Sequence, residues 1–459
     1  MIQASDLRQC ASLFNDYTEL RVQQNRSVEI ALVNGDVMRN ARSVTGGSSA
    51  RVGGCGAWGF ASAPEVGTKT FERIVERASR NASVLKMGKN LERELPETRT
   101  EGAFDYATEK ERMGQKELLD FARSLDAYIL KNFPDLQSRV VVLRNLDMEK
   151  SLLTSQGAEA YSMTPRSLIY VDMTMMSEGE PVNLFEGYGG LGQFEDQFGA
   201  PEDLFDKLQS QYEHLVKKAK GVYAEAGPKE CILDADLAGI LAHEAIGHTT
   251  EADFVMGGSV AAHYMDQEVA SPLVNLVDFA HHALGETCPI PVHVDDEGTP
   301  AEDVTIIEEG VLKSYMHNKE SAAHFETGPK GNARAFLFSD EPLIRMRNTA
   351  ILPGESKLED MIASIDDGYY LMRPGNGQAD TTSEFMFAVV QGYEIKKGKL
   401  GRAIKDTTIS GVAFDLLKTV TALSDEMKWV ATGMCGKKQP IPVGMGGPAI
   451  KCTVNMGGR

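Results

Sequence analysis

The chain has 459 residues, 42% of them hydrophobic, which is enough for two or more domains with cores of their own. Its 66 acidic residues outnumber its 47 basic ones, and the net charge of −19 disfavours direct binding of nucleic acid or of an anionic membrane. No stretch approaches about 20 uninterrupted apolar residues, and the start MIQASDLRQCASLF lacks a basic region before a long apolar run, so we expect a cytoplasmic globular protein.

The first half of the chain predicts an α+β domain of helices and hairpins over residues 1–222. Apolar residues that alternate with period two predict strands, and helical spacing predicts helices. The predicted helices are 5–15, 69–86, 113–133 and 201–221, and the predicted strands are 18–24, 27–43, 49–62, 138–157 and 160–179. Asn34-Gly35 is typical of a hairpin turn. Residues 91–108 are polar, and we expect irregular structure there.

The second half, residues 223–459, predicts a complex and mostly antiparallel β domain that carries one metal-binding helix. Strand-like runs alternate with glycine-rich turns at 289–298, 304–318, 384–401 and 448–458. The fold class predicted for the whole chain is therefore α+β, with the joint between the domains near Gly221.

The hexapeptide HEAIGH places His243, Glu244 and His248 on one short apolar segment. In the familiar HExxH helix the histidines stand four residues apart, about 400° of rotation, and share a face. Five residues of regular α-helix give about 500°, which would point the two imidazoles apart. A single π-type turn, with Gly247 before the second histidine, restores the common face. The sequence from Leu233 predicts a helix start capped by Asp, and the polar run at 249–253 predicts that the helix then leaves the core.

Two histidines are too few for a catalytic zinc, which normally has three protein ligands and an open position for water. Glu251 and Asp253 are close in sequence, and Cys435 is a distant alternative. The six cysteines form no CxxC pair and are too sparse for a disulfide framework, so we expect mostly buried thiols. Glycines and lysines around Cys435 predict a flexible, electropositive turn that favours thiolate, which favours this residue without deciding the choice.

Other motifs carry less chemistry. Three glycine patterns, at 54–59, 187–192 and 444–449, resemble a dinucleotide fingerprint but lack its strand and helix context, so we interpret them as tight turns at strand ends. The third could also allow close approach of a substrate backbone. His281 and His282 are adjacent, so their side chains are expected to diverge. The acidic run at 295–297 lacks the pattern of a calcium loop and predicts a solvated turn.

Several long motifs together resemble the TldD/PmbA family. They are HEAIGHTTEADF, DDEGTP with its continuation IIEEGVLKSYMHNK, GNARA followed by RMRNTAILPGES, GNGQADTTSEFMF, and GMCGK with PVGMGGPAIKCTVNMGG. The resemblance spans the C-terminal half, and GCGAWGFAS extends it more weakly into the N-terminal half. The family was named as modulators of DNA gyrase, and its TldD branch is similar to zinc metallopeptidases acting on unstructured peptides. The TldE or PmbA branch lacks the HExxxH ligands, so this chain resembles the TldD branch.

Carried over by position, the resemblance implies that His243, His248 and Cys435 bind zinc and that Glu244 is the general base. The chain departs from the commonest TldD pattern at 249–253, where TTEAD replaces a Gly-Leu-Glu-Gly-Asp type of sequence, so the rim of the pocket is expected to differ. Members of the family resemble obligate dimers. We therefore expect either a PmbA/TldE-like paralogue as heterodimer partner or a homodimer.

The predicted function is a zinc-dependent metallopeptidase that hydrolyses unstructured peptides or small proteins, with Glu244 activating the zinc-bound water. A thiolate ligand makes the metal a weaker Lewis acid, which predicts slow, selective cleavage. One alternative is a non-catalytic regulator of gyrase or of a toxin–antitoxin pair, with a structural zinc closed by a fourth protein ligand such as Glu251. Another is a zinc amidase acting on small molecules in a narrow, closed pocket.

Overall fold

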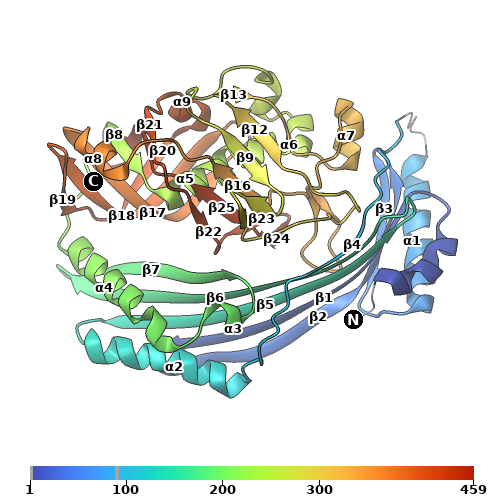
Figure 1. The fold of residues 1–459 in the computed structure, drawn as a ribbon, viewed down its shortest axis with the longest axis horizontal. Coiled ribbons are helices and arrows are strands. Elements are labelled where there is room, and N and C mark those ends of the chain that lie inside the picture. Colours follow the sequence, from blue (N-terminus) through green and yellow to red (C-terminus); the bar gives the residue numbers. More distant parts are fainter. Residues whose placement is uncertain (1–3, 88–92, 459) are drawn as a thin grey trace.

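The α+β class predicted from the sequence is confirmed by a computed structural model that describes residues 4–87 and 93–458. A long, curved sheet from the first half lies against a set of shorter strands and helices from the second half (Figure 1). No helix in the described residues combines the length and the apolar character needed to cross a membrane.

The sheet of the first half has the strand order β3-β2-β1-β5-β6-β4, and β7 also pairs with β6. Its pairs are antiparallel, except that β4 runs parallel to β6. The elements are β1 (Thr18–Val33), β2 (Asp36–Gly54), β3 (Ala57–Ala63), α1 (Thr68–Lys86), β4 (Glu101–Asp105), α2 (Gln115–Asn132), β5 (Ser138–Thr154), β6 (Glu159–Ser177), β7 (Glu180–Leu191), α3 (Phe194–Gln197) and α4 (Phe205–Ala219), with 3-10 helices at Ala4–Leu13 and Pro201–Leu204.

Most predicted elements of this half are confirmed, including the hairpin turn at Asn34 and Gly35, both of which have positive φ. The first predicted helix is present as a 3-10 helix over Ala4–Leu13. One prediction is wrong, because the segment expected to be irregular contains β4. That strand was missed because it is short and polar and pairs only with β6, about 60 residues later, whereas sequence patterns report local order. Residues 91 and 92 of the segment lie outside the described residues.

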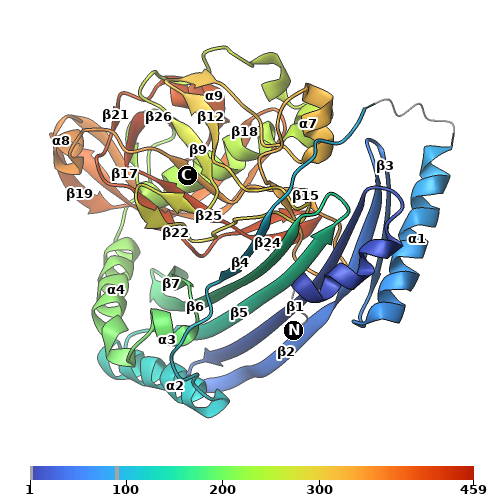
Figure 2. The ribbon, with the colours of Figure 1, turned by 45° about the vertical axis from the view of Figure 1, so that its right-hand side comes forward.

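The two faces of the long sheet carry different side chains. Along β1, Leu20 and Val22 join an apolar cluster with α1, while the intervening Arg21 and Gln23 point to the other face. There they donate hydrogen bonds to second-half carbonyls, Arg21 to Leu337 (3.1 Å) and Gln23 to Phe336 (2.6 Å). Helices α2 and α4 cover one end of the sheet (Figure 2). The face opposite α1 is therefore a polar surface on which the second half packs.

The acidic run at 295–297 is buried against this platform, so the predicted solvated turn is wrong. Glu297 Oε1 lies 2.6 Å from Arg51 Nη1, and Asp296 Oδ2 lies 2.7 Å from Lys150 Nζ. The cations come from β2 and β5, more than 140 residues earlier, and local sequence patterns do not show such partners. These ion pairs connect the two halves.

The second half contains two larger sheets, with strand orders β13-β12-β9-β16-β25-β22 and β17-β8-β26-β20-β18-β19, the latter also including β21. Only β16–β25 and β17–β8 pair in parallel within them, so the prediction of a mostly antiparallel half is correct. The predicted boundary at 222/223 stays a prediction. The strands are β8 (Gly227–Leu233), β9 (Leu276–Phe279), β10 (His282–Ala283), β11 (Glu286–Thr287), β12 (Val304–Glu308), β13 (Val311–Leu312), β14 (Ala333–Arg334), β15 (Leu343–Ile344), β16 (Asn348–Ile351), β17 (Asp367–Ala379), β18 (Glu384–Lys396), β19 (Lys399–Ala403), β20 (Thr407–Val412), β21 (Ala422–Leu423), β22 (Lys428–Val430), β23 (Met434–Lys437), β24 (Gln439–Pro442), β25 (Gly444–Gly447) and β26 (Ile450–Met456). The helices are α5 (Ala235–Ile240), α6 (Ala252–Met256), α7 (Lys319–Phe325), α8 (Leu358–Ala363) and α9 (Ala413–Lys418).

Three predictions for local motifs need correction. Residues 289–298 form a loop, not a strand. Of the glycine patterns, only the one at 54–59 is a hairpin turn, because those at 187–192 and 444–449 lie largely within β7 and β25. His281 and His282 do not diverge, since their Nδ1 atoms lie 2.8 Å apart.

Candidate metal centre

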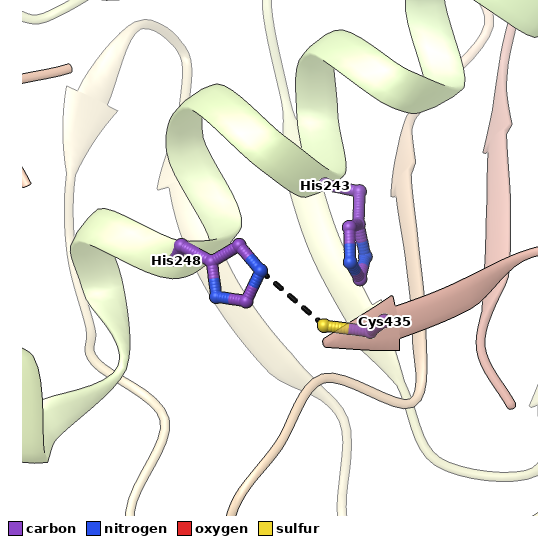
Figure 3. A group of neighbouring side chains, drawn as sticks. All are labelled: His243, His248 and Cys435. Carbon is purple, nitrogen blue, oxygen red and sulfur yellow. Dashed lines mark hydrogen bonds between the residues drawn. The ribbon is translucent and has the colours of Figure 1, made fainter. Parts of the chain in front are cut away.

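The HEAIGH segment lies on a helix that changes its pitch. Asp234 caps the start of α5 by accepting a hydrogen bond from the backbone N–H of Leu237 (2.9 Å), as the sequence predicted. The helix then becomes a π-helix over Leu241–Gly247 and a 3-10 helix from His248. The wider turn restores the common face, and the rings of His243 and His248 lie 5.3 Å apart (Figure 3). The predicted π-type turn is confirmed.

Cys435 meets the two histidines from the other end of the sequence. Its Sγ lies 3.3 Å from Nε2 of His248, and one ligand atom from each of the three residues lies within 4.8 Å of the others. The predicted flexible turn is wrong, because Cys435 is buried in β23, which pairs with β24. The turn of this hairpin is at Lys438, whose φ is +59°. A paired strand holds the thiol more firmly than a loop would.

The electrostatics of the three side chains favour a thiolate. Burial raises the pKa of the Cys435 thiol, but His243 and His248 outweigh burial and bring this pKa to about 5. Burial lowers the pKa of His248, but Glu251 and Cys435 outweigh it and raise the pKa to about 10. Both ring nitrogens of His243 are buried and have no hydrogen-bond partner among the described residues. Such orphaned atoms are costly unless something else binds them.

The donor set fits a zinc ion. Zinc binds imidazole nitrogen and thiolate sulfur at about 2.0–2.3 Å, and tetrahedral geometry then separates nitrogen and sulfur by about 3.5 Å, near the observed 3.3 Å. No fourth His, Cys, Asp or Glu donor from the described residues joins the group. A metal held here would therefore keep an open coordination position, the arrangement typical of catalytic sites.

Glu244 lies beside this group without belonging to it. Its carboxylate oxygens are 3.6 Å from Nε2 of His248 and 4.0 Å from Nε2 of His243, and its side chain is 26% exposed. The carboxylate therefore faces both the imidazoles and solvent. This position suits a group that exchanges a proton with a molecule entering the site.

Glu251 and Asp253, considered above as third ligands, lie behind the site. Oε2 of Glu251 accepts a hydrogen bond from Nδ1 of His248 (2.7 Å), on the side of the ring away from Cys435. Asp253 instead accepts a hydrogen bond from Lys437 (2.7 Å). The expectation that the helix leaves the core at 249–253 is wrong, because residues 249–251 are fully buried. The sequence did not predict that Glu251 orients His248. The spacing of three residues between them, next to a helix, could have indicated this contact.

Among the glycines at 444–447, Gly446 and Gly447 lie against α5. The close approach of a substrate backbone to this segment stays a prediction. A Cβ on Gly447 would lie 2.9 Å from Cβ of Ala238, and one on Gly239 would lie 3.0 Å from the backbone nitrogen of Gly446. Strand β25 thus lies directly against α5, and the space is already filled. This close packing fixes the helix that carries the histidines.

A protein-family model matches the second half of the chain, where the candidate site lies. The model of the PmbA/TldA metallopeptidase C-terminal domain matches residues 226–458, about half of the chain. The chain belongs to the TldD/PmbA family. Domain 1 of the same metallopeptidase family matches residues 18–82, so both halves of the chain carry TldD/PmbA sequence.

Among relatives, a metalloprotease of Methanocaldococcus jannaschii is 28% identical over 459 aligned residues, covering 95% of this chain and 96% of the relative. A zinc metalloprotease TldD homologue of Saccharolobus solfataricus is 33% identical and covers 56% of this chain and 58% of its own. The crystal structure of TldE from Thermococcus kodakarensis shares the fold, with a TM-score of 0.75, 15% identity and coverage of 99% of both chains. Relatives named as metalloproteases thus span this TldD/PmbA chain, including the candidate site.

Proposed function

We propose that this chain is a zinc metallopeptidase of the TldD type, in which His243, His248 and Cys435 hold the metal and Glu244 transfers the proton. The observation that carries the proposal is the three-donor group with its two orphaned His243 nitrogens and an acidic side chain beside it. The open coordination position favours a catalytic metal over the structural zinc of a purely regulatory protein.

The side chains divide the work of hydrolysis. A zinc ion at this site would activate water and polarise a peptide carbonyl. Glu244 accepts the proton released when water attacks and returns it to the leaving amine. Glu251 accepts the Nδ1–H of His248 and so directs the unprotonated Nε2 toward the metal position. Because Cys435 supplies a thiolate, we expect slower and more selective cleavage than with neutral or carboxylate ligands.

An extended, unstructured peptide is the substrate that we propose. Strand β22 is the edge of its sheet, and with residues 431 and 432 it lines a cleft of about 630 Å³ between the two halves. An extended peptide can add to such an edge through its backbone, which a folded protein cannot do. The chain runs from β22 to Cys435 within five residues, so this edge is near the metal site in sequence. We further propose that the active form is a dimer, with a TldE-like paralogue or a second copy.

The test uses purified full-length protein and matched substrates. Zinc-loaded and chelator-treated enzyme are incubated with a pool of unfolded peptides and with the folded proteins from which the peptides derive, and mass spectrometry identifies the products. We expect cleavage of the unfolded pool only, lost on chelation and restored by zinc. Absence of zinc-dependent products would contradict the proposal, and cleavage of small amides but not of peptides would favour an amidase.

A further inference from the structure

The segment 431–434 leads directly into the strand of Cys435, and it is held by a side chain from the other half of the molecule. Arg166, on β6 of the long sheet, donates hydrogen bonds through Nη2 to the carbonyls of Ala431 and Gly433, the latter at 3.1 Å. Its Nη1 lies 3.5 Å from Sδ of Met434, the residue before the cysteine. One guanidinium therefore binds three positions along this short segment.

The strand beside Arg166 leaves room for the same segment. A Cβ on Gly187 of β7 would lie 2.8 Å from Cγ2 of Thr432, and one on Gly190 would lie 3.1 Å from Cβ of Ala431. Larger residues at these two positions would push the segment away from the sheet. Glycines of the pattern at 187–192 thus permit this contact between the halves.

Within the part of the chain that the structure describes, Arg166 forms no ion pair. Its side chain is 5% exposed, and its hydrogen bonds go to 431–434 rather than to a carboxylate of the described residues. Burial lowers the pKa of Arg166 to about 10, and only the Tyr170 phenol opposes this effect. Burying a cation without a carboxylate partner costs free energy, so stability alone does not explain its presence.

Further contacts of the β23–β24 hairpin come from the second half itself. Nη2 of Arg345 donates to the carbonyl of Cys435 (2.9 Å), and its Nη1 donates to the carbonyl of Gln439 (2.8 Å). Nζ of Lys437 donates to the carbonyl of Ile344 (3.1 Å). Among the described residues, Arg166 is the only side chain of the first half that donates hydrogen bonds to the backbone of residues 431–439.

We propose that Arg166 is a positioning residue for Cys435, through which the long sheet of the first half sets the place of the thiolate in the metal site. The inference rests on the proposed role of Cys435 as a metal ligand. Metal bonds tolerate only small errors in ligand position, and losing a residue that orients a ligand typically lowers metal affinity about 10- to 100-fold. The first half of the chain would then contribute to metal binding without supplying a ligand.

Cobalt titration tests this inference without measuring peptide cleavage. Metal-free full-length protein is titrated with Co²⁺, and the near-ultraviolet charge-transfer band of a cobalt–thiolate bond reports whether Cys435 binds. We expect Arg166→Met to lower the cobalt affinity about tenfold or more and to weaken the band. Arg39→Met, which removes an exposed arginine from β2 of the same sheet, should match wild type.

Each outcome decides the inference. Unchanged cobalt affinity and band in a folded Arg166→Met protein would overturn it, even if the melting temperature falls, because a purely structural role changes only stability. If Arg166→Met does not fold, Arg166→Lys replaces it, because lysine keeps the charge but lacks the forked donors. A several-fold loss of cobalt affinity in Arg166→Lys supports the inference. Wild-type cobalt affinity in this variant overturns it. A wild-type protein without the charge-transfer band would overturn both the ligand role of Cys435 and this inference. A normal band with no peptide cleavage would contradict only the proposed function.

Discussion

Oε2 of Glu251 lies 2.7 Å from Nδ1 of His248, and the same oxygen lies 3.3 Å from Nζ of Lys437. Lys437 is two residues beyond Cys435 on β23, so one buried carboxylate connects the helix of the histidines with the strand of the thiol. A carboxylate behind a metal-binding histidine fixes the ring orientation and its tautomer. Glu251 therefore supports two parts of the candidate centre at once.

Replacing Glu251 should weaken metal binding without removing a ligand. Glu251→Gln keeps the size of the side chain but loses the charge that orients His248, and we expect zinc affinity to fall about 10- to 100-fold. Competition with a chromophoric chelator measures this affinity. Asp253→Asn is the matched control, because Asp253 also contacts Lys437 but not the histidine, and it should bind zinc nearly as wild type does. Equal affinities of wild type and Glu251→Gln would refute the orienting role.

Gly247 is required by packing around the π-helical turn. A Cβ at this position would lie 2.0 Å from Sδ of Met346, so Gly247→Ala should cost about 1–3 kcal/mol of stability and displace His248. Met346→Ala removes the clash, and the double variant should recover part of the stability and zinc affinity lost by Gly247→Ala. Urea unfolding and zinc titration of the four proteins measure the coupling. Purely additive effects would show that the clash is not the cause.

The sequence predicted those features of the site that depend on neighbouring residues. The five-residue spacing of His243 and His248 indicated a π-type turn, and the Asp before the apolar run indicated the helix start. Both are local consequences of helix geometry, and the structure contains both.

Features that depend on distant partners were predicted less well. Local patterns predict a solvated turn at 295–297, because they do not reveal that Arg51 and Lys150, from strands much earlier in the chain, pair with these carboxylates. Cys435 was assigned to a flexible turn because glycines flank it, but pairing with β24 and the contact with Arg345 hold it in a strand. Such contacts arise only when the two halves and their sheets come together.

Glu186 should make stability depend on pH between about 5 and 7. Burial, aided by Asp236 and opposed by Arg373, raises the pKa of Glu186 from 4.5 to about 7. The folded protein then holds this proton more tightly than the unfolded chain, so its contribution is complete below about pH 4.5 and is lost as pH rises through 7. The melting temperature of wild type should therefore fall relative to that of Glu186→Gln over this range. Glu180→Gln, an exposed change on the same strand, should parallel wild type, and parallel curves for all three would contradict the prediction.

Removing the metal should destabilise the wild-type protein. A ligand that binds only the folded state stabilises it by about 2.7 kcal/mol at a free concentration 100 times its Kd. We expect a chelator to lower the melting temperature of zinc-loaded wild type, and a smaller effect in Cys435→Ser, which lacks the thiolate. Differential scanning fluorimetry with and without chelator measures both. An identical shift in the two proteins would mean that Cys435 does not bind the metal.

In the proposed mechanism, Glu244 transfers the proton at a metal held by His243, His248 and Cys435. Zinc content and cleavage of unfolded peptides, read by mass spectrometry, are compared for wild type, Glu244→Gln and Cys435→Ser. We predict that Glu244→Gln keeps the zinc content of wild type but loses cleavage by at least about 100-fold, in keeping with a general base, while Cys435→Ser loses both. Cleavage by zinc-loaded Glu244→Gln at the wild-type rate would contradict the role of Glu244 as the general base.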